Sequence, residues 1–354
     1  MTVNSCFTSE KISKIRWIHE EYQDANTFVT GSWGSARNNI KVWSIADSNY
    51  AKEFSIKCVD KHSTIGDVTG LEVFNKNSLA AVTVEGLLQV FNVDKITDNF
   101  SLSRRGGVEN LHKFKRGNRA PCNGICVYDD YAATFGEDGR LNILSLADLC
   151  ILHDIAEGDN CSVTTALFAN SKEILTGNRM GVIKQFDVRS KNKEALSTFP
   201  ISGNDERKSV AITNMCCHPT QKHIVISGTE EGSLMVWDLR KIGFPISCFK
   251  AHAQAITEIG FHKTQPSRLF TASEGGEFWQ WVQQETSFPL NQSQAFPSES
   301  DSNNPWLDSK RTKNQINVTS LITGVRRAIN SFDVHGSHLA CGGDNEAVYI
   351  IATE

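Results

Sequence analysis

Three histidines and a pair of cysteines are the residues of this sequence whose types and spacing could support metal chemistry. Cys216, Cys217 and His218 are consecutive, and His252 and His262 follow in the next part of the chain. Thiolates and imidazoles are ligands that zinc prefers in proteins. Consecutive residues of a strand point to opposite faces, however, so the two thiols cannot share one ion without distortion. The structural interpretation is therefore favoured, with the cysteines as small buried apolar residues, and no metal site is predicted.

The sequence also lacks the signatures of common catalytic sites. It contains no Gly-x-Ser-x-Gly nucleophile elbow and no phosphate-binding loop that ends in Gly-Lys-Ser or Gly-Lys-Thr. The glycine pairs at 275–276 and 342–343 fall in predicted turns, and the carboxylates at 137–138 and 230–231 have a turn-capping role available. We therefore predict that the protein is not an enzyme and that it binds no cofactor and no small-molecule substrate.

The elements that position these residues are short strands that recur seven times along the chain. Each copy begins with six residues of the form apolar-x-x-apolar-x-apolar, with a short polar residue second. This alternation is the period of a strand rather than of a helix. The apolar positions are Ile12/Ile15/Trp17, Val68/Leu71/Val73, Cys122/Ile125/Val127, Val163/Ala166/Phe168, Ile212/Met215/Cys217, Ile256/Ile259/Phe261 and Ile329/Phe332/Val334.

The second half of each copy is a tight turn followed by a strand that ends on a large apolar anchor. The turn needs a residue that can adopt positive φ. Five copies use Gly there, and the other two use Asn, which also visits this region often. The turn and anchor pairs are Asn38–Trp43, Gly86–Phe91, Gly139–Leu144, Gly181–Phe186, Gly232–Trp237, Gly276–Trp281 and Asn345–Ile350. Most intervals between anchors match the length of a four-stranded propeller blade.

A single copy of this unit cannot bury both of its faces, so neighbouring copies must stack around a ring. Seven copies therefore predict an all-β, seven-bladed β-propeller that takes up residues 1–354 as one domain. The sequence ends too soon after Ile350 to supply a fourth strand to the last blade. We expect Val3 to Thr8 to provide that strand, which closes the ring and protects an open sheet edge.

The fifth and sixth copies resemble WD40 repeats. The fifth copy ends in Trp237-Asp238, and the sixth opens with Ala251-His252. The sixth has Val282 at the position where Asp is usual, so the signature is degenerate. The resemblance implies structural hydrogen-bond networks within the blades rather than an active site. The residues that it assigns to these networks are His252, Ser273, Trp281, Trp237 and Asp238.

Two copies end in a short motif that supports an alternative function. Residues 187–189 and 238–240 resemble the Asp-x-Arg box through which some WD40 proteins dock on the adaptor of cullin-RING ubiquitin ligases. This resemblance implies a substrate receptor with Asp238, Arg240 and Arg189 at a partner interface. The simpler interpretation is local pairing of each Asp with its Arg, which stabilises little on a surface. A third hypothesis, a reader of peptides or modified lysines in the central channel, would need an aromatic cage that the sequence does not locate.

Composition excludes several further classes of function. The 354 residues include 36 basic and 40 acidic side chains, and the net charge of −4 gives no electrostatic basis for nucleic-acid binding. No run of about eighteen apolar residues exists, so we expect no membrane insertion. The first residues lack the profile of a secretory signal. We therefore expect the ten cysteines to be free thiols in the reducing cytosol or nucleus.

Two segments interrupt the repeat. Residues 94–120 form an excursion rich in Arg and Lys, whereas residues 284–314 are rich in Ser, Asn, Gln and Pro and are expected to form a mobile polar loop. We predict that Val108–Phe114 and Ile316–Leu321 are the delayed fourth strands of the second and sixth blades. Both excursions then emerge on one face of the disc, which is a candidate docking surface. The alternative is that they are tolerated surface insertions.

Trp306 is an isolated apolar residue within the second excursion. An exposed Trp is unfavourable unless it packs on something, which here is either its own blade or a partner. Both alternatives stay open, and Trp306 joins Arg240 as a candidate partner contact.

The whole chain resembles one particular WD40 family. The segments that carry the resemblance are 11–17, 27–33, 120–124, 135–142, 304–307 and 316–321. In order and spacing they are similar to the nucleoporin 43 family, a WD40 subunit of the Y-shaped scaffold complex of the nuclear pore. The resemblance implies a non-catalytic scaffold in the outer rings of the pore, whose propeller docks on the α-solenoid subunit of the short arm. It also implies a location at kinetochores in mitosis, and an indirect part in mRNA and protein transport through pore assembly.

Overall fold

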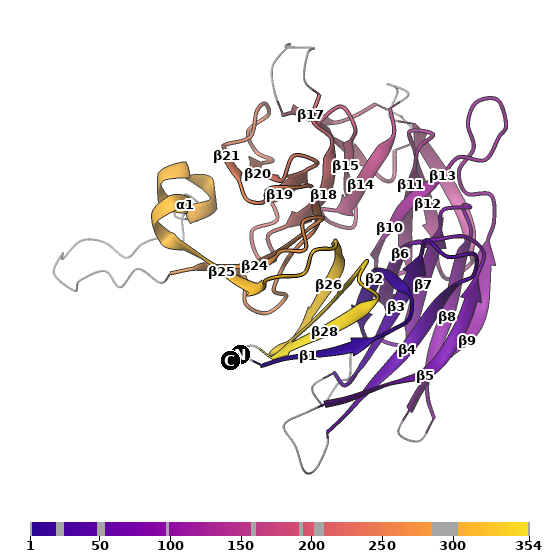
Figure 1. Ribbon diagram of the computed structural model, residues 1–354. Coiled ribbons are helices and arrows are strands. Elements are labelled where there is room, and N and C mark those ends of the chain that lie inside the picture. Colours follow the sequence, from indigo (N-terminus) through magenta and orange to yellow (C-terminus); the bar gives the residue numbers. More distant parts are fainter. Residues whose placement is uncertain are drawn as a thin grey trace.

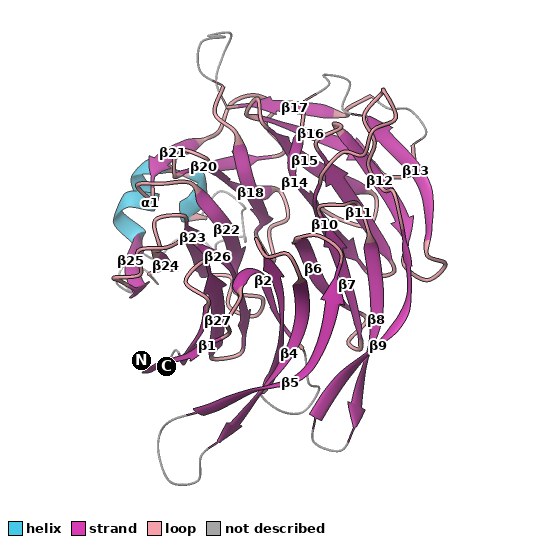
Figure 2. Cartoon of the chain, turned by 45° about the vertical axis from the view of Figure 1, so that its right-hand side comes forward, coloured by secondary structure: helices cyan, strands magenta, loops and turns pink. Residues whose placement is uncertain are grey.

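The structure, a computed structural model, consists of seven four-stranded sheets. It describes residues 2–18, 25–47, 54–96, 99–156, 161–190, 194–201, 209–284 and 304–352. The sheets stand side by side around a central axis, and their innermost strands contact one another in a closed ring (Figures 1 and 2). The all-β, seven-bladed propeller that the repeat predicts is therefore confirmed.

In each blade we label the strands a to d from the axis outward. Blade 1 contains β2 (Lys11–Trp17), β3 (Thr27–Trp33), β4 (Asn38–Asp47) and β5 (Phe54–Thr64), and blade 2 contains β6 (Val68–Phe74), β7 (Ser78–Thr83), β8 (Leu88–Ile96) and β9 (Asn99–Val108). Blade 3 contains β10 (Cys122–Tyr128), β11 (Tyr131–Gly136), β12 (Arg140–Ser145) and β13 (Cys150–Ala156), and blade 4 contains β14 (Val163–Phe168), β15 (Glu173–Asn178), β16 (Val182–Asp187) and β17 (Ser197–Pro200). Blade 5 contains β18 (Ile212–Cys217), β19 (Ile224–Thr229), β20 (Ser233–Asp238) and β21 (Ser247–Lys250), and blade 6 contains β22 (Ile256–Phe261), β23 (Arg268–Ser273), β24 (Phe278–Gln283) and β25 (Ile316–Ile322). Blade 7 contains β26 (Ile329–His335), β27 (His338–Gly343), β28 (Ala347–Ala352) and β1 (Thr2–Phe7).

The apolar positions of the repeat build the cores between neighbouring blades. Between blades 2 and 3, for example, Val82 and Leu88 of one blade pack in a single cluster with Ile125 and Leu144 of the next. A cluster of this kind lies between each pair of neighbours around the ring. Each blade therefore depends on both neighbours for burial of its two faces, which is why the fold needs a complete ring.

The short polar residue at the second position of strand a links four of the blades to the next one. Its side chain donates a hydrogen bond to the carbonyl oxygen of the first repeat residue in the following blade. The donor and acceptor pairs are Asn123–Val163, Thr164–Ile212, Thr257–Ile329 and Asn330–Ile12. The last of these pairs crosses from blade 7 to blade 1, so the same bond that joins consecutive blades also joins the two ends of the ring.

The predicted closure of the ring by an N-terminal strand is confirmed. β1 pairs with β28 in antiparallel register from Thr2 opposite Ala352 to Phe7 opposite Ala347. The backbone N–H of Thr8 then donates to the carbonyl of Glu346 at 2.8 Å. Figure 1 shows the two chain ends side by side at the edge of this blade. The first and last segments of the chain thus share one sheet and hold the ring shut.

Five of the seven predicted turns adopt positive φ as expected, and the two at asparagine do not. The five have φ between 69° and 81°, at Gly86, Gly139, Gly181, Gly232 and Gly276. In blade 7 the residue with positive φ is Glu346 (57°), one position beyond Asn345. In blade 1 it is Gly34 (73°) in a longer loop. Asn38 instead begins β4, where its buried amide donates to the Asp67 carboxylate at 2.8 Å.

The prediction for the basic excursion is wrong. Strand d of blade 2 is β9, which pairs with β8 directly, so the strand does not lie at Val108–Phe114. Arg104 and Arg105 belong to this strand. They made the segment look like a loop, because the outermost strand of a blade has a free edge on which charged side chains are tolerated. The rest of the excursion, residues 109–121, joins strand d of blade 2 to strand a of blade 3.

The two excursions therefore emerge on opposite faces of the disc. Because strand direction alternates, the a–b and c–d connections lie on one face and the b–c and d–a connections on the other. We call these the c–d face and the d–a face. Residues 109–121 form a d–a connection, whereas residues 284–315 form a c–d connection. The shared docking face that we predicted for both excursions is corrected accordingly.

The prediction for the second excursion is correct for its strand and wrong for part of its loop. The expected delayed strand is present as β25. Residues 304–314, expected to be mobile, instead form η2 (Pro305–Leu307) and α1 (Ser309–Gln315). They are ordered because Asp308 caps α1, accepting from the Lys310 N–H at 2.8 Å, and because Trp306 is buried. The rest of the predicted loop, 285–303, lies outside the described residues.

Candidate interaction surfaces

The WD40 network of blade 6 is present, but it uses a different hydroxyl from the predicted one. The ring of His252 lies 2.9 Å from the Glu277 carboxylate through Nδ1 and 2.8 Å from the Thr271 hydroxyl through Nε2. The indole N–H of Trp281 donates to the same hydroxyl at 2.9 Å. Ser273 is buried, and among the described residues its hydroxyl has no hydrogen-bond partner. Thr271, two residues earlier on the same strand, takes the role that we had assigned to Ser273.

Blade 3 contains a matching network that the sequence did not predict. His112 is buried in the d–a connection, with Nδ1 2.9 Å from Asp138 and Nε2 3.1 Å from the Thr134 hydroxyl. It was missed because this copy has Leu144 where a WD40 unit usually has Trp. In blade 5 the predicted anchor is in place, and the Trp237 indole donates to Ser227 at 2.9 Å. These networks fix the connections between blades and leave no ring nitrogen of His112 open for chemistry.

Both Asp-x-Arg motifs form local pairs. Arg240 donates through Nε and Nη2 to the two carboxylate oxygens of Asp238, each at 2.9 Å. Arg189 forms the same fork with Asp187 at 3.0 and 2.7 Å, and its hydrogen bonds lower the pKa of Asp187 to about 2. The Arg189 and Arg240 side chains are 62% and 44% exposed. The guanidinium groups therefore reach solvent on the c–d face while their charges are partly satisfied within the chain.

Trp306 packs on its own molecule. Its side chain is 0% exposed and belongs to the core between blades 5 and 6. Its ring stacks on Phe249 and meets Phe261 edge-on, with centroids 6.3 Å apart in both cases. Of the two alternatives left open by the sequence, the structure shows the first, so Trp306 is corrected from a partner contact to a core residue.

The segments that extend the minimal four-stranded repeat lie on the c–d face. The β4–β5 and β8–β9 hairpins are longer than their counterparts in other blades and extend beyond the disc (Figure 2). Both Asp-x-Arg motifs and the η2–α1 segment belong to c–d connections. In the connection after β20, Ile242 and Phe244 are 72% and 59% exposed. This face thus offers a larger and more varied surface than the tight turns of an ideal propeller.

In blades 5, 6 and 7 the third residue of strand a satisfies a backbone group of the next blade from within the central channel. Its side chain accepts a hydrogen bond from the N–H of the fourth-position residue in the following blade. The acceptor and donor pairs are Asn214–Ile259, Glu258–Phe332 and Ser331–Ile15, at 3.0, 2.8 and 3.1 Å. Strand a has no strand neighbour toward the axis, so these N–H groups would otherwise lack a partner.

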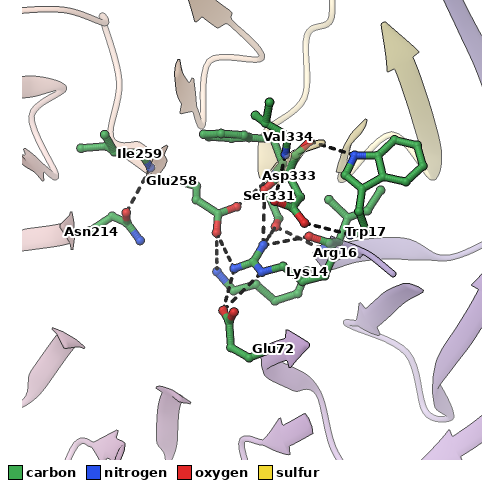
Figure 3. Close-up of polar contacts among 12 residues, drawn as sticks. Lys14, Arg16, Trp17, Glu72, Asn214, Glu258, Ile259, Ser331, Asp333 and Val334 are labelled. Carbon is green, nitrogen blue, oxygen red and sulfur yellow. Dashed lines mark hydrogen bonds and ion pairs between the residues drawn. The ribbon is translucent and has the colours of Figure 1, made fainter. Parts of the chain in front are cut away.

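Arg16 is the centre of a charged network in this channel (Figure 3). Its guanidinium bonds Glu258 of blade 6 at 2.8 Å, Glu72 of blade 2 at 2.9 Å and the Ser331 hydroxyl of blade 7 at 3.1 Å. Burial acts to raise the pKa of Glu258, but the attraction of Arg16 and then of Lys14 outweighs it and holds that pKa below its usual range. The network borders a cavity of about 420 Å³ inside the ring of a strands. Arg16 therefore joins four blades, across both ends of the chain.

The cysteines and histidines weighed for metal chemistry are structural. All ten cysteines are free, and burial raises the pKa of Cys217 to about 11 and that of Cys216 well above its ordinary value. His262 lies 2.9 Å from the carbonyl of Gly336 through Nε2. Among the described residues, no group of three or more His, Cys, Asp or Glu side chains is placed to hold a metal ion. No helix in that part of the chain has the length and apolar character needed to span a bilayer.

His218 should make the stability of the protein depend on pH. Its ring is 4% exposed, and Nδ1 accepts from the Gln221 N–H at 3.1 Å, which requires that nitrogen to be unprotonated. Burial, followed by repulsion from His223 and Lys222, lowers the pKa to about 4. An unfolded chain with the ordinary pKa of about 6.5 binds the proton first. The contribution of His218 is therefore complete above about pH 6.5 and is lost as pH falls toward 4, on the order of 2 to 3 kcal/mol.

Urea unfolding of the wild-type chain and of His218→Asn between pH 7 and 4 measures this dependence. We expect the free energy of unfolding to fall less steeply with acid in the variant. Equal slopes would contradict the assignment, because the other acid-sensitive groups are common to both proteins.

The fold and these sites together define a class of protein, a closed WD40-type propeller in which the residues suited to chemistry stabilise the ring. Consistent with this class, the WD domain, G-beta repeat family matches residues 196–238. The chain is 31% identical to the nucleoporin Nup43 of Homo sapiens and to that of Mus musculus, and each alignment covers 97% of both proteins. It is 21% identical to the nuclear pore complex protein nup43 of Dictyostelium discoideum, over 68% of this chain and 73% of that protein. The chain therefore belongs to the Nup43 family, which consists of nucleoporins and not of enzymes.

Proposed function

We propose that the protein is a structural subunit of the nuclear pore, held in the Y-shaped scaffold complex of the outer rings. The observation that carries this proposal is similarity to Nup43 over 97% of both chains. A closed ring also suits the role, because a rigid body loses little conformational freedom when it binds. The protein then acts as a scaffold subunit that binds other proteins and holds them in position.

We infer that its partners are other nucleoporins of that complex, in particular the α-solenoid subunit of the short arm. The c–d face is the proposed docking surface, with Arg189 and Arg240 among its contacts. The exposure of these side chains and the extended hairpins on that face support this choice. Through pore assembly the protein would support transport of mRNA and protein, and it would accompany the same complex to kinetochores in mitosis.

Affinity purification of the tagged chain followed by lysine crosslinking tests the proposal. We expect scaffold nucleoporins as the main partners, with crosslinks concentrated at lysines of the c–d face, such as Lys172 and Lys241. Lysines of the d–a face, such as Lys113 and Lys115, are the internal control. Recovery of a cullin-RING adaptor instead, abolished by joint replacement of Arg189 and Arg240 with Ala, would favour the ligase receptor and contradict the proposal.

A further inference from the structure

The groove between blades 5 and 6 on the c–d face shows what this propeller can bind between two blades. Trp306 fills the groove and lies between the Phe249 and Phe261 rings. The Ser247 hydroxyl donates to the carbonyl oxygen of Trp306 at 3.3 Å, which ties down the backbone of the η2 turn. One aromatic side chain on a short turn, with one hydrogen bond to its carbonyl, thus completes this inter-blade groove.

The groove between blades 3 and 4 occupies the equivalent place in the repeat. Strand register identifies the matching residues. Strand c begins directly after the turn glycine in both blades 3 and 5, and the first four pairs between strands c and d correspond one to one. The equivalent pairs are His153 and Ser247 on strand d, Ile143 and Val236 on strand c, and Phe168 and Phe261 at the sixth position of strand a. The groove between blades 3 and 4 is therefore lined by aromatic and aliphatic side chains at the same positions of the repeat as the groove between blades 5 and 6.

The two grooves differ in what occupies them. Between blades 3 and 4 there is a cavity of about 400 Å³, and no described residue takes the place that Trp306 has in the other groove. Tyr131, the first residue of strand b, is 52% exposed, whereas its equivalent Ile224 is 0% exposed. Leu152 beside it is 48% exposed. The Nε2 atom of His153 is buried without a hydrogen-bond partner among the described residues, at the position from which Ser247 bonds Trp306.

The charges at the edge of this groove are positive. Its charged lining side chains are Lys172 and Arg189. Lys172 is exposed on the a–b connection of blade 4. Arg189 is paired with Asp187 and also attracted by Glu173, but neither carboxylate is among the residues that line the groove. A carboxylate in the occupant would therefore be attracted to this edge and would gain a charge-assisted hydrogen bond.

We propose that the groove between blades 3 and 4 is a docking site for an acidic segment of a protein partner. The partner inserts an aromatic side chain between Tyr131, Leu152 and Phe168, in the way that Trp306 inserts between blades 5 and 6. His153 Nε2–H donates to a backbone carbonyl of the segment, and a carboxylate of the segment lies against Lys172 and Arg189. This site does not depend on a role in the nuclear pore, because it rests only on the geometry of blades 3 to 6.

A peptide taken from this chain provides the probe. A fluorescently labelled synthetic peptide of residues 304–309 carries Trp306 on its turn with Asp308 beside it. We expect saturable binding to the full chain in fluorescence polarisation. We expect a loss of about tenfold or more when Leu152→Arg fills the groove, and a similar loss when Ala replaces Trp in the peptide. Lys172→Glu should weaken binding of this peptide and strengthen binding of a version with Lys at the Asp position.

The matched control is Ile242→Arg, which places the same charge at another exposed apolar residue of the c–d face. Leu152 and Ile242 are both exposed, so both variants should keep the wild-type melting temperature. The absence of saturable binding, or binding that survives Leu152→Arg or is lost with Ile242→Arg, would overturn the proposal. Self-association of the free chain that Leu152→Arg abolishes would assign the groove to a second copy and would overturn it as well.

Discussion

Replacing Arg16 with Met should lower the free energy of unfolding by about 3 to 5 kcal/mol, the range seen when one partner of a buried ion pair is removed. Glu258 has a side chain that is 9% exposed, and without Arg16 its nearest cation is Lys14 at 3.9 Å. The substitution also removes the hydrogen bonds of the Arg16 side chain to blades 2, 6 and 7. Urea unfolding at neutral pH measures the effect. A second variant, Arg16→Met with Glu258→Gln, should recover part of the loss because no buried carboxylate then lacks its cation.

The control for this experiment is an ion pair of similar chemistry on the surface. Arg140 lies 3.3 Å from Asp154, and both side chains are more than a third exposed. Arg140→Met should change the free energy of unfolding by less than about 1 kcal/mol. Equal effects at Arg16 and Arg140 would contradict the view that the channel network holds the ring together. The Arg16 network should also weaken in acid, because the lowered pKa of Glu258 gives stability that is lost as pH falls through that pKa.

Removal of residues 1–8 should destabilise the protein by about 5 kcal/mol, because it opens the ring. The deletion removes a strand that pairs with β28 along six residues, and each lost hydrogen bond has a net value of about 1 kcal/mol. It also exposes the edge of β28, which can then pair with other chains. We expect a lower urea midpoint and concentration-dependent aggregation in light scattering.

A synthetic peptide of residues 1–10 makes this test specific to strand pairing. Added in excess to the truncated chain, it should restore the midpoint and suppress aggregation. Val3→Thr in the full chain is the control, because Val3 is 46% exposed and a threonine keeps the strand pairing. A truncated chain as stable as the full one would show that the seventh blade does not need β1.

The blades and their closure could be predicted because their causes repeat along the sequence. Ile12 and Ile15 are buried for the same reason as Ile256 and Ile259, because the first and fourth positions of strand a are buried in every copy. The need to close the last sheet then follows from the position of Ile350. The polar second position has a partly shared cause, since it bonds the next blade in four copies, whereas Ser13 and Thr69 bond a carbonyl of their own blade.

Some features could not be predicted because they depend on contacts between segments that are distant in the sequence. Another could not be predicted because the outermost strand of a blade tolerates charged side chains. Arg16 and Glu258 are 242 residues apart, and only the ring brings them together, although a charge at an inward-facing position of strand a was a visible signal. Trp306 bonds Ser247 across 59 residues, and nothing in residues 304–307 shows which groove they fill. β9 was misplaced because Arg104 and Arg105 resemble loop residues, whereas an outer edge strand carries such charges readily.

These observations suit a protein that is held by others rather than one that acts on a substrate. The histidines at 112, 218, 252 and 262 all bond groups of their own chain. The c–d face is the partner surface that we propose, and the groove between blades 3 and 4 opens on that same face. A partner could therefore contact the Asp-x-Arg positions and the groove together, which would raise its affinity through a larger continuous interface.

The fraction of the chain that co-fractionates with the nuclear pore scaffold tests the central claim most directly. Quantitative mass spectrometry across a size-exclusion profile of cell extract gives this fraction for the chain and for the scaffold subunits. We predict that nearly all of the chain elutes with those subunits and in a constant ratio to them. A large free pool with no scaffold partner, eluting at the size of a single propeller, would contradict the account.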